Sequence, residues 1–283
     1  MTTAHPSQPN SADDGSSTSQ NGAIGNQARF QLDTAASQKE SAHNSAKGES
    51  TARGPATNPA TNYDNTQLAL SRSSLDRKII RVQRDVLKMG ALVENSCLLA
   101  REALCDRNLD SAKKIPIQDK QIDTLYRQIE VDCTNLLTLE APVTQDLRMV
   151  SAFMQMIRDL ERIGDYAKSI GAIAIKLFPF PVHDCMADIE TMLDRCRSMV
   201  ALCLRSLSEL DPIAGRSIKQ KDDVVDDDYT RLYEQLVSTP CNPGASVEAI
   251  VLMVLVIRSL ERIADHATNV GKRVTFVVTG ERF

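Results

Sequence analysis

The feature that most constrains this chain is an internal repeat of two helical sequence patterns. The segment RDLERIGDYA at 158–167 aligns with RSLERIADHA at 258–267, an offset of 100 residues. Upstream, the pattern DxxxDxxY occurs at 119–126 and again at 222–229, an offset of 103 residues. Two matches in the same order are rare by chance, so we interpret the chain as an internal duplication. The connecting turn is the simplest place for the three-residue difference between the offsets.

Both copies have the sequence pattern of α-helices. From residue 63 onward, apolar side chains recur with the 3.6-residue period of a helix, and no convincing run shows the two-residue period of a strand. Aromatic residues make up only 4% of the chain and Trp is absent, which favours packed helices over sandwiches or barrels. We therefore predict an all-α fold.

Turn residues divide this region into six predicted helices. They span about 64–106, 108–139, 142–177, 183–210, 212–237 and 245–279, and the prolines within 178–181 mark a hinge between the halves. Short connections of this kind are typical of antiparallel bundles. We predict two tandem antiparallel three-helix bundles, residues 63–180 and 181–283. One long continuous bundle is the alternative, and the repeat favours two.

The N-terminal segment, residues 1–62, has a different composition. Ser, Thr, Asn, Gln, Ala and Gly dominate it, with very few large apolar side chains. Such a segment buries too little apolar surface to offset the entropy lost on ordering. We predict that residues 1–62 form a disordered N-terminal tail.

Charge and apolar patterning indicate where the protein works. The chain has 33 basic and 37 acidic side chains, and this net charge of −4 argues against nucleic-acid binding. No apolar signal segment is visible at the N-terminus, and the longest apolar run, 249–257, is too short to span a bilayer. Seven cysteines without a CxxC pair fit reduced core residues. We expect a soluble, cytoplasmic protein without direct membrane insertion.

Each half carries two acidic pairs spaced i, i+4, which lie on one helix face and repel each other. Their distances from the predicted turns match. In the first half, Pro142 is the midpoint between Asp123 and Glu161 and also the midpoint between Asp119 and Asp165. In the second half, both cross-helix pairs have their midpoint between Pro243 and Gly244. Antiparallel helices would therefore set four carboxylates level, twice: Asp119, Asp123, Glu161 and Asp165, then Asp222, Asp226, Glu261 and Asp265.

Four carboxylates at one level repel one another unless a cation balances their charge. These eight residues are therefore candidate metal ligands. Carboxylate-rich sites suit Mg, Mn or Fe, and Zn is also allowed. His266 could add a nitrogen ligand, although it lies one residue off the acidic face. The alternative is a solvated acidic face whose charge is balanced by Arg158, Arg162, Arg258 and Arg262. The matched register favours the metal.

The doubled Leu-Glu-Arg-Ile-Gly/Ala-Asp signature resembles the PhoU family, the phosphate-specific transport accessory proteins of bacteria. The segments at 88–94 and 141–148 also resemble that family, and the resemblance runs from about residue 64 to the C-terminus. It implies two three-helix bundles whose acidic motifs bind metal clusters, for which we expect Fe, Zn or Mn. The family's motifs fall on the eight acids named above. Two departures are Ser259 opposite Asp159, which would make the sites unequal, and the long N-terminal tail.

The resemblance also implies a function. It implies negative regulation of phosphate uptake and of phosphate-starvation signalling, through contact with a phosphate ABC transporter ATPase and its sensor histidine kinase. It further implies a homodimer recruited to the inner face of the membrane by these partners, and no enzymatic activity. One alternative is a di-metal carboxylate enzyme of ferritin-like type, but the only Glu-x-x-His lies at 40–43, within the predicted tail. A metal-free helical scaffold is the other alternative.

Overall fold

Six α-helices form where the apolar periodicity predicts them. The structure is a computed structural model that describes residues 59–238 and 246–282, with side chains from Arg72 onward. Within these ranges there is no strand. The elements are α2 (Pro59–Leu104), α3 (Leu109–Asn135), the short π-helix η1 (Leu136–Glu140), α4 (Thr144–Leu177), α5 (Met186–Glu209), α6 (Pro212–Ser238) and α7 (Val247–Thr279).

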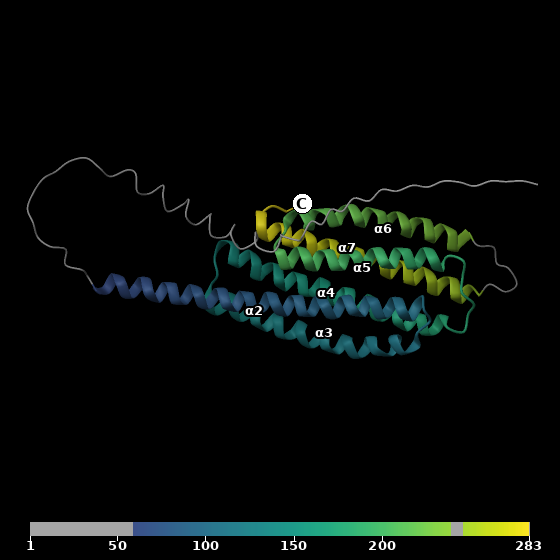
Figure 1. Ribbon diagram of the computed structural model, residues 1–283, viewed down its shortest axis with the longest axis horizontal. Coiled ribbons are helices and arrows are strands. Elements are labelled where there is room, and N and C mark those ends of the chain that lie inside the picture. The colour runs from purple at the N-terminus through teal and green to yellow at the C-terminus, as the bar shows by residue number, and fades with distance from the viewer. Residues whose placement is uncertain (1–58, 239–245, 283) are drawn as a thin grey trace, which may run out of the picture. The chain divides into compact units, whose positions relative to one another are not determined.

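The helices pack as two antiparallel three-helix bundles, which confirms the predicted fold class (Figure 1). Helices α2, α3 and α4 pack on one another, and so do α5, α6 and α7. The two bundles contact each other through α4 with α7 and through α2 with α5, so that the described helices belong to one compact unit. The predicted tail lies outside the described residues up to position 58, as do the turn cluster at 240–244 and Cys241.

Repeated capping side chains show that the duplication extends to the helix ends. The side-chain oxygen of Asn108 accepts hydrogen bonds from the backbone N–H groups of Asp110 and Ser111, at 3.1 and 3.3 Å. At the equivalent position of the second repeat, Asp211 Oδ1 accepts from the N–H groups of Ile213 and Ala214, at 2.8 and 3.2 Å. Such caps satisfy N–H groups that lack a partner at a helix start. They fix where α3 and α6 begin.

The two repeats place their second motif at different distances from a helix start. The turn of the second repeat, where the sequence places the length difference most simply, lies outside the described residues at 239–245. Measured from the start of its own helix, however, Glu161 lies three residues further along α4 than Glu261 does along α7. Three residues are nearly one helical turn, so α4 gains almost a full turn before its motif and the face of the motif is preserved.

The predicted apolar stripes form the contact between the bundles and the core. Positions 160, 163, 167 and 170 on α4 and positions 260, 263, 267 and 270 on α7 are all 2% exposed or less. They belong to a continuous cluster of buried side chains contributed by both bundles. Burying one Leu or Ile side chain stabilises a fold by about 1.5–3 kcal/mol, so this shared core holds the two bundles together.

We define the α4–α7 seam as the contact between these two inner helices. Tyr166 and His266 occupy equivalent positions of the two repeats, and their rings stack across the seam with centroids 6.0 Å apart. A residue that contacts its own repeat equivalent lies close to the axis that relates the two copies. The seam is therefore pseudo-symmetric about the Tyr166–His266 stack.

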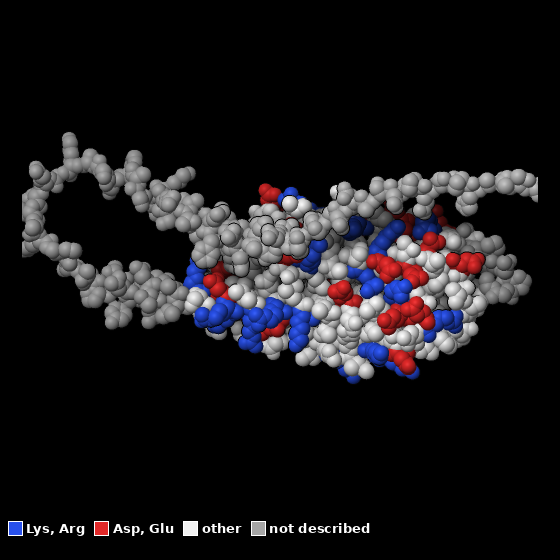
Figure 2. Space-filling model, in the orientation of Figure 1, with Lys and Arg blue, Asp and Glu red and all other residues white. Residues whose placement is uncertain are grey.

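A second inter-bundle contact lies at the C-terminal end of α2. The guanidinium of Arg101 forms ion pairs with Glu190 and Asp194 on α5 and with Asp106 just beyond its own helix, the last two at 3.3 and 3.2 Å. Figure 2 shows acidic and basic side chains interspersed over this end of the molecule, whereas basic side chains gather over the middle of α2. The charged network ties α2 to α5 at the surface.

The six described cysteines are free thiols, as predicted, and five of them are buried. Burial raises the pKa of Cys97 and Cys203 to about 12, so both stay protonated and unreactive at neutral pH. Among the described helices, none combines the length and the hydropathy that a membrane span requires.

Helices α6 and α7 approach each other closely at two glycines, Gly215 and Gly271. A Cβ atom added to Gly271 would lie 2.8 Å from the carbonyl oxygen of Gly215 and 2.7 Å from Ile218 Cδ1. In the first repeat Ala112 replaces Gly215 and only the isoleucine contact recurs, because a Cβ on Gly171 would lie 2.6 Å from Ile115 Cδ1. These helices can pack at this distance only if position 271 lacks a side chain.

We expect Gly271→Ala to lower the free energy of unfolding by about 1–3 kcal/mol, the usual effect of overpacking, because a backbone carbonyl cannot move aside cheaply. Urea denaturation followed by circular dichroism measures it. The matched control is Gly164→Ala, whose Cβ would lie 3.2 Å from the flexible end of Ile122 and whose repeat equivalent is already Ala264. The control should be neutral or stabilising by up to about 1 kcal/mol. Equal stability of both variants would contradict the close approach.

Candidate functional site

Three of the first four predicted site residues share one half-buried surface between α3 and α4. Asp123 on α3 and Glu161 and Asp165 on α4 are all half-buried. Burial raises the pKa of Glu161, and the negative charges of Asp165 and Asp123 raise it further, against the opposing effect of Arg162. The register predicted from the turn therefore brings these carboxylates within electrostatic reach of one another.

The fourth residue, Asp119, is buried and already has a cationic partner. Lys168 on α4 forms an ion pair with Asp119 Oδ2. This hydrogen bond raises the pKa of Lys168, and the charges of Asp165 and Asp123 add to the effect. One ammonium group thus sits among three of the predicted ligands. Sequence reasoning missed Lys168 because the second repeat has Thr268 at the equivalent position, so no repeated signal pointed to it.

The second repeat brings its acids together in the same way on α6 and α7. Burial raises the pKa of Asp226, with contributions from the charges of Asp222 and Asp265. Burial also raises the pKa of Glu261, where Asp265 and Asp226 add to the effect and Arg258 opposes it. Both repeats therefore hold carboxylates that repel one another across two helices.

Asp222 is the most deeply buried of the eight acids, with 3% of its surface exposed. Its Oδ2 accepts a hydrogen bond from Lys219 at 3.1 Å, one turn earlier on α6. Its Oδ1 is buried and has no hydrogen-bond partner among the described residues. A buried carboxylate oxygen without a donor is costly, so this atom is suited to a cation.

Arginines that lie one residue after or three residues before the acids balance part of the charge on α4 and α7, as the alternative of a solvated acidic face predicts. Arg162 lies 3.5 Å from Glu161 and 3.4 Å from Asp165. On α7, the closest ion-pair distances are 2.7 Å for Arg258 with Glu261 and 2.8 Å for Arg262 with Asp265. Arg162 is exposed, whereas Arg258 and Arg262 are half-buried. Ion pairs at exposed positions contribute about 0–1 kcal/mol each.

Within the part of the chain that the structure describes, no three His, Cys, Asp or Glu side chains converge closely enough to hold a metal ion. The carboxylates lie on one surface in each repeat but turn toward lysine and arginine. The donor set nevertheless fits a hard or borderline cation: oxygen ligands, mutual repulsion in both repeats, and one orphaned oxygen at Asp222. A metal would have to displace Lys168 and Lys219 from Asp119 and Asp222.

His266 and Asp159 belong to the α4–α7 seam instead of the acidic surfaces. His266 Nδ1 lies 2.9 Å from Asp159 Oδ1, and Arg273 binds the other oxygen of Asp159 at 2.9 and 3.0 Å. The equivalent of Asp159 is Ser259, whose hydroxyl donates to the carbonyl of Leu255 within its own helix. The difference between Asp159 and Ser259 thus makes the seam unequal, and Lys168 and Lys219 make the two acidic surfaces unequal.

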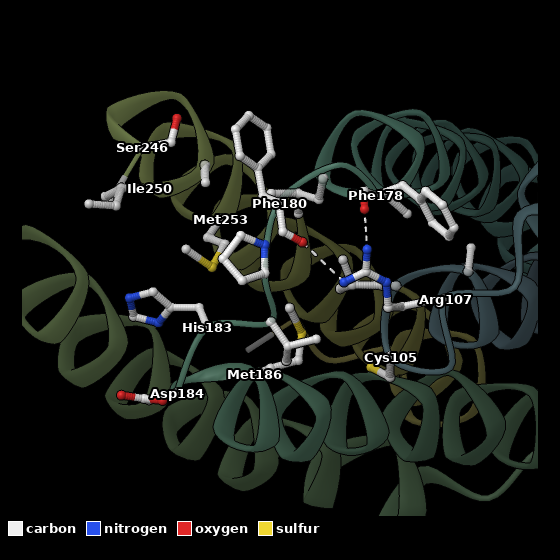
Figure 3. A pocket seen from close by; sticks show the side chains of 17 residues that line it. Cys105, Arg107, Phe178, Phe180, His183, Asp184, Met186, Ser246, Ile250 and Met253 are labelled. Carbon is white, nitrogen blue, oxygen red and sulfur yellow. Dashed lines mark hydrogen bonds between the residues drawn. The ribbon is translucent and has the colours of Figure 1, made fainter. Parts of the chain in front are cut away.

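Sequence reasoning also missed a mostly apolar cavity of about 200 Å³ where the linker after α4 passes the ends of α2 and α7 (Figure 3). Arg107 holds the linker by donating to the carbonyl oxygens of Phe178 and Phe180. His183 Nδ1 lies 3.0 Å from Cys185 Sγ, the spacing of a nucleophilic pair. Burial raises the pKa of Cys185 to about 11, so the thiolate that such chemistry needs does not form near neutral pH.

The two repeats match a known family. A family model described as "PhoU domain" matches residues 86–174 and again residues 189–274. A protein of Synechocystis sp., named phosphate-specific transport system accessory protein PhoU homolog, is 51% identical over 211 residues, which cover 75% of this chain and 94% of that protein. A protein of Deinococcus radiodurans with the same name is 29% identical over 75% of this chain and 99% of its own length.

Solved structures show the same architecture. The crystal structure of PhoU from Pseudomonas aeruginosa aligns with a TM-score of 0.71 at 28% identity, covering 73% of this chain and 99% of that one. The phosphate transport system regulatory protein PhoU from Streptococcus pneumoniae aligns with a TM-score of 0.69 at 27% identity, covering 74% and 99%.

The raised pKa of Glu161 predicts how its removal changes stability. A raised carboxyl pKa means that the folded state binds the proton more tightly than the unfolded chain, so stability falls as the pH rises through that pKa. In chelator at pH 7, Glu161→Gln should therefore raise the free energy of unfolding by roughly 0.2–0.5 kcal/mol, the size of one i, i+4 repulsion. The gain should shrink as the pH falls through the pKa of Glu161. Urea titrations across this pH range measure it.

The control is Glu234→Gln on α6, an exposed residue with no ion pair among the described side chains. It should leave stability unchanged at every pH. A loss of stability for Glu161→Gln at pH 7, or a gain that persists in acid, would show that the carboxylates of α3 and α4 do not repel one another.

Proposed function

The chain belongs to the PhoU family, and on that premise we propose that it is a non-enzymatic regulator of phosphate uptake and phosphate-starvation signalling. Relatives that cover its two bundles are named accessory or regulatory proteins of phosphate transport. The observation that carries the proposal is the pair of acidic surfaces, one on α3 and α4 and one on α6 and α7, each with carboxylates whose pKa is raised by burial and by like charge. Lysine and arginine side chains balance only part of this negative charge, so the surfaces are suited to binding cations or basic partners.

The first part of the proposal is that each acidic surface binds a metal ion or cluster. In the first repeat the ligands are Asp119, Asp123, Glu161 and Asp165, and in the second they are Asp222, Asp226, Glu261 and Asp265. Fe, Zn or Mn is the cation we favour, and Mg suits the same oxygen donors. The cation supplies positive charge, which removes the repulsion and satisfies the buried oxygen of Asp222. It has to compete with Lys168 and Lys219, which makes binding dependent on the metal concentration.

The second part concerns partners. We propose that the protein acts as a negative regulator in the cytoplasm, where it docks the ATPase of a phosphate ABC transporter and the sensor histidine kinase, and that it forms a homodimer. The names of the relatives support an association with the transport system. Recruitment by these partners would place it at the inner face of the membrane without a membrane segment of its own.

The geometry gives little support to an enzyme. The Glu-x-x-His of ferritin-like centres occurs only at 40–43, outside the described residues. The His183–Cys185 pair, which resembles a nucleophilic site, has a buried thiol of raised pKa. A metal-free scaffold remains the competing proposal, and metal analysis separates the two.

Elemental analysis by mass spectrometry of full-length protein purified without a metal-affinity tag tests the metal. We expect about one or more equivalents of Fe, Mn or Zn per acidic surface in the parent and a loss of most of it in a variant without the α4 and α7 acids. That variant carries Glu161→Ala, Asp165→Ala, Glu261→Ala and Asp265→Ala.

A charge-matched control removes four acids elsewhere: Asp184, Glu209, Glu234 and Glu281, each to Ala. It should keep the metal content of the parent. A parent without metal even after incubation with Fe, Mn, Zn and Mg salts would refute the metal centre and leave the acidic surfaces as docking sites for basic partners.

Complementation tests the regulatory function. In cells that lack this protein, a phosphate-regulon reporter should stay active at high phosphate, and the parent chain should restore repression. Charge reversal of both acidic surfaces, with Lys at positions 161, 165, 261 and 265, should abolish repression and co-purification with the transporter ATPase. Normal repression and normal co-purification by a stably expressed reversed variant would show that these surfaces are not where the partners bind.

A further inference from the structure

A basic cavity at one end of the α4–α7 seam plays no part in the proposed metal and docking surfaces. It has a volume of about 180 Å³ and is lined by Ala152 and Gln155 on α4 and by residues near the C-terminal end of α7. The charged groups among its lining residues are all cationic, namely Lys272, Arg273 and Arg282. The volume needed for one water is about 10–15 Å³, so the cavity has room for a polyatomic anion.

Two of the three cations have no acidic partner among the described residues. Lys272 is half-buried and forms no ion pair within this part of the chain. Arg282 is exposed and lies over the ring of Phe276, 5.0 Å from its centroid, a contact that leaves its N–H groups available. The cavity therefore has a surplus of positive charge, and a half-buried ammonium without a counter-ion is unfavourable.

The third cation is held rigidly. Arg273 binds Asp159 through Nε and one terminal nitrogen, and its other terminal nitrogen donates to Gln155 Oε1 at 2.6 Å. This leaves the amide N–H₂ of Gln155 free to donate, and the side-chain amide of Asn269 makes no hydrogen bond to another described residue. Rigid and free donors thus face the same cavity, and Asn269 also offers an acceptor.

A fourth cation lies on α4, before Ala152 in the chain. Arg148 is half-buried, and its Nε is buried without a hydrogen-bond partner in the described chain. Its guanidinium lies beside the backbone of Gly280, 3.4 Å from where a Cβ of that residue would be. Arg148 adds further positive potential near this end of the seam.

The repeat shows that these cations are not needed to pack the seam. The equivalents of Lys272 and Arg273 in the first repeat are Ala172 and Ile173, and the equivalent of Gln155 is Leu255. At the other end of the seam these positions carry no charge: Ile173 is buried, whereas Ala172 and Leu255 are exposed. Only one end has gathered polar and cationic groups at these positions of the described chain.

We propose that this cavity binds a small phosphate-type oxyanion. Guanidinium and ammonium groups form charge-assisted hydrogen bonds with such anions, and amide donors complete the shell. A hydrogen phosphate ion also has an O–H group, which can donate a hydrogen bond to the side-chain carbonyl oxygen of Asn269. Sulfate has no such donor. The inference rests on the cavity alone, and it holds whether or not the acidic surfaces bind metal or partners.

Isothermal titration calorimetry of inorganic phosphate into the full chain, in chloride buffer with a chelator, tests the site. We expect saturable binding that is at least about tenfold weaker in the double variant Lys272→Gln/Arg282→Gln, as the loss of charge-assisted hydrogen bonds predicts. The control Arg84→Gln/Lys176→Gln removes the same charge from exposed positions on α2 and α4 and should bind like the parent. Sulfate should bind more weakly than phosphate, and Asn269→Leu should reduce that difference.

The absence of saturable phosphate binding by the parent would overturn the proposal, and so would an equal loss in the cavity variant and the control. Neither replaced side chain forms an ion pair within the described chain, so the double variant should melt at the parent temperature. If the double variant does not fold, the phosphate affinity of Arg282→Gln alone, at an exposed position beyond α7, is compared with that of the parent and of the control. Because no transporter or metal is present, a negative result leaves the regulatory function untouched.

Discussion

The close packing of α4 against α7 is the constraint on which the rest of the structure depends. Four apolar positions on each helix face the other bundle or the core and fix the rotation of both helices about their axes. Once that rotation is fixed, Glu161 and Asp165 must lie beside the stripe on α4, and Glu261 and Asp265 beside the stripe on α7. The acidic surfaces are thus a geometric consequence of the core, and any change that rotates α4 or α7 moves carboxylates as well as apolar side chains.

The two copies differ mainly in how their charges are balanced. The first repeat places a lysine on α4, where it reaches across to Asp119, whereas the second uses a lysine on the same helix as Asp222. Lys168 connects α4 to α3, whereas Lys219 pairs with a residue of its own helix. The other side-chain oxygen of Asp222 has no donor in the described chain. The most buried acid of the first repeat therefore has a partner on the neighbouring helix, whereas the most buried acid of the second repeat keeps one oxygen without a donor in the described chain.

Much of the fold could be predicted from the sequence because an amphipathic helix has apolar residues at a regular spacing along the chain. The six helices, their hinge and the apolar stripes at 160–170 and 260–270 follow from spacing alone, and the turn positions indicate the register that brings Asp123 to Glu161. Contacts that break the repeat could not be predicted in this way. Lys168 and Arg273 have no equivalent charged residue in the other copy, and what they bind depends on how the bundles meet. The π-helix η1 was also out of reach, since the spacing of apolar residues does not distinguish it from the end of an α-helix.

The stacked rings of Tyr166 and His266 give the seam a pivot. Arg273 lies two helical turns beyond His266, a lever of roughly 10 Å along α7. A tilt of one bundle about this stack would change the distance between the two rings very little. It would lengthen the hydrogen bonds of Arg273 with Asp159 and Gln155 by more, because they lie further from the stack. At Arg273, therefore, a small tilt of one bundle would change polar contacts. An ion bound there between α4 and α7 would fix the angle between the two bundles.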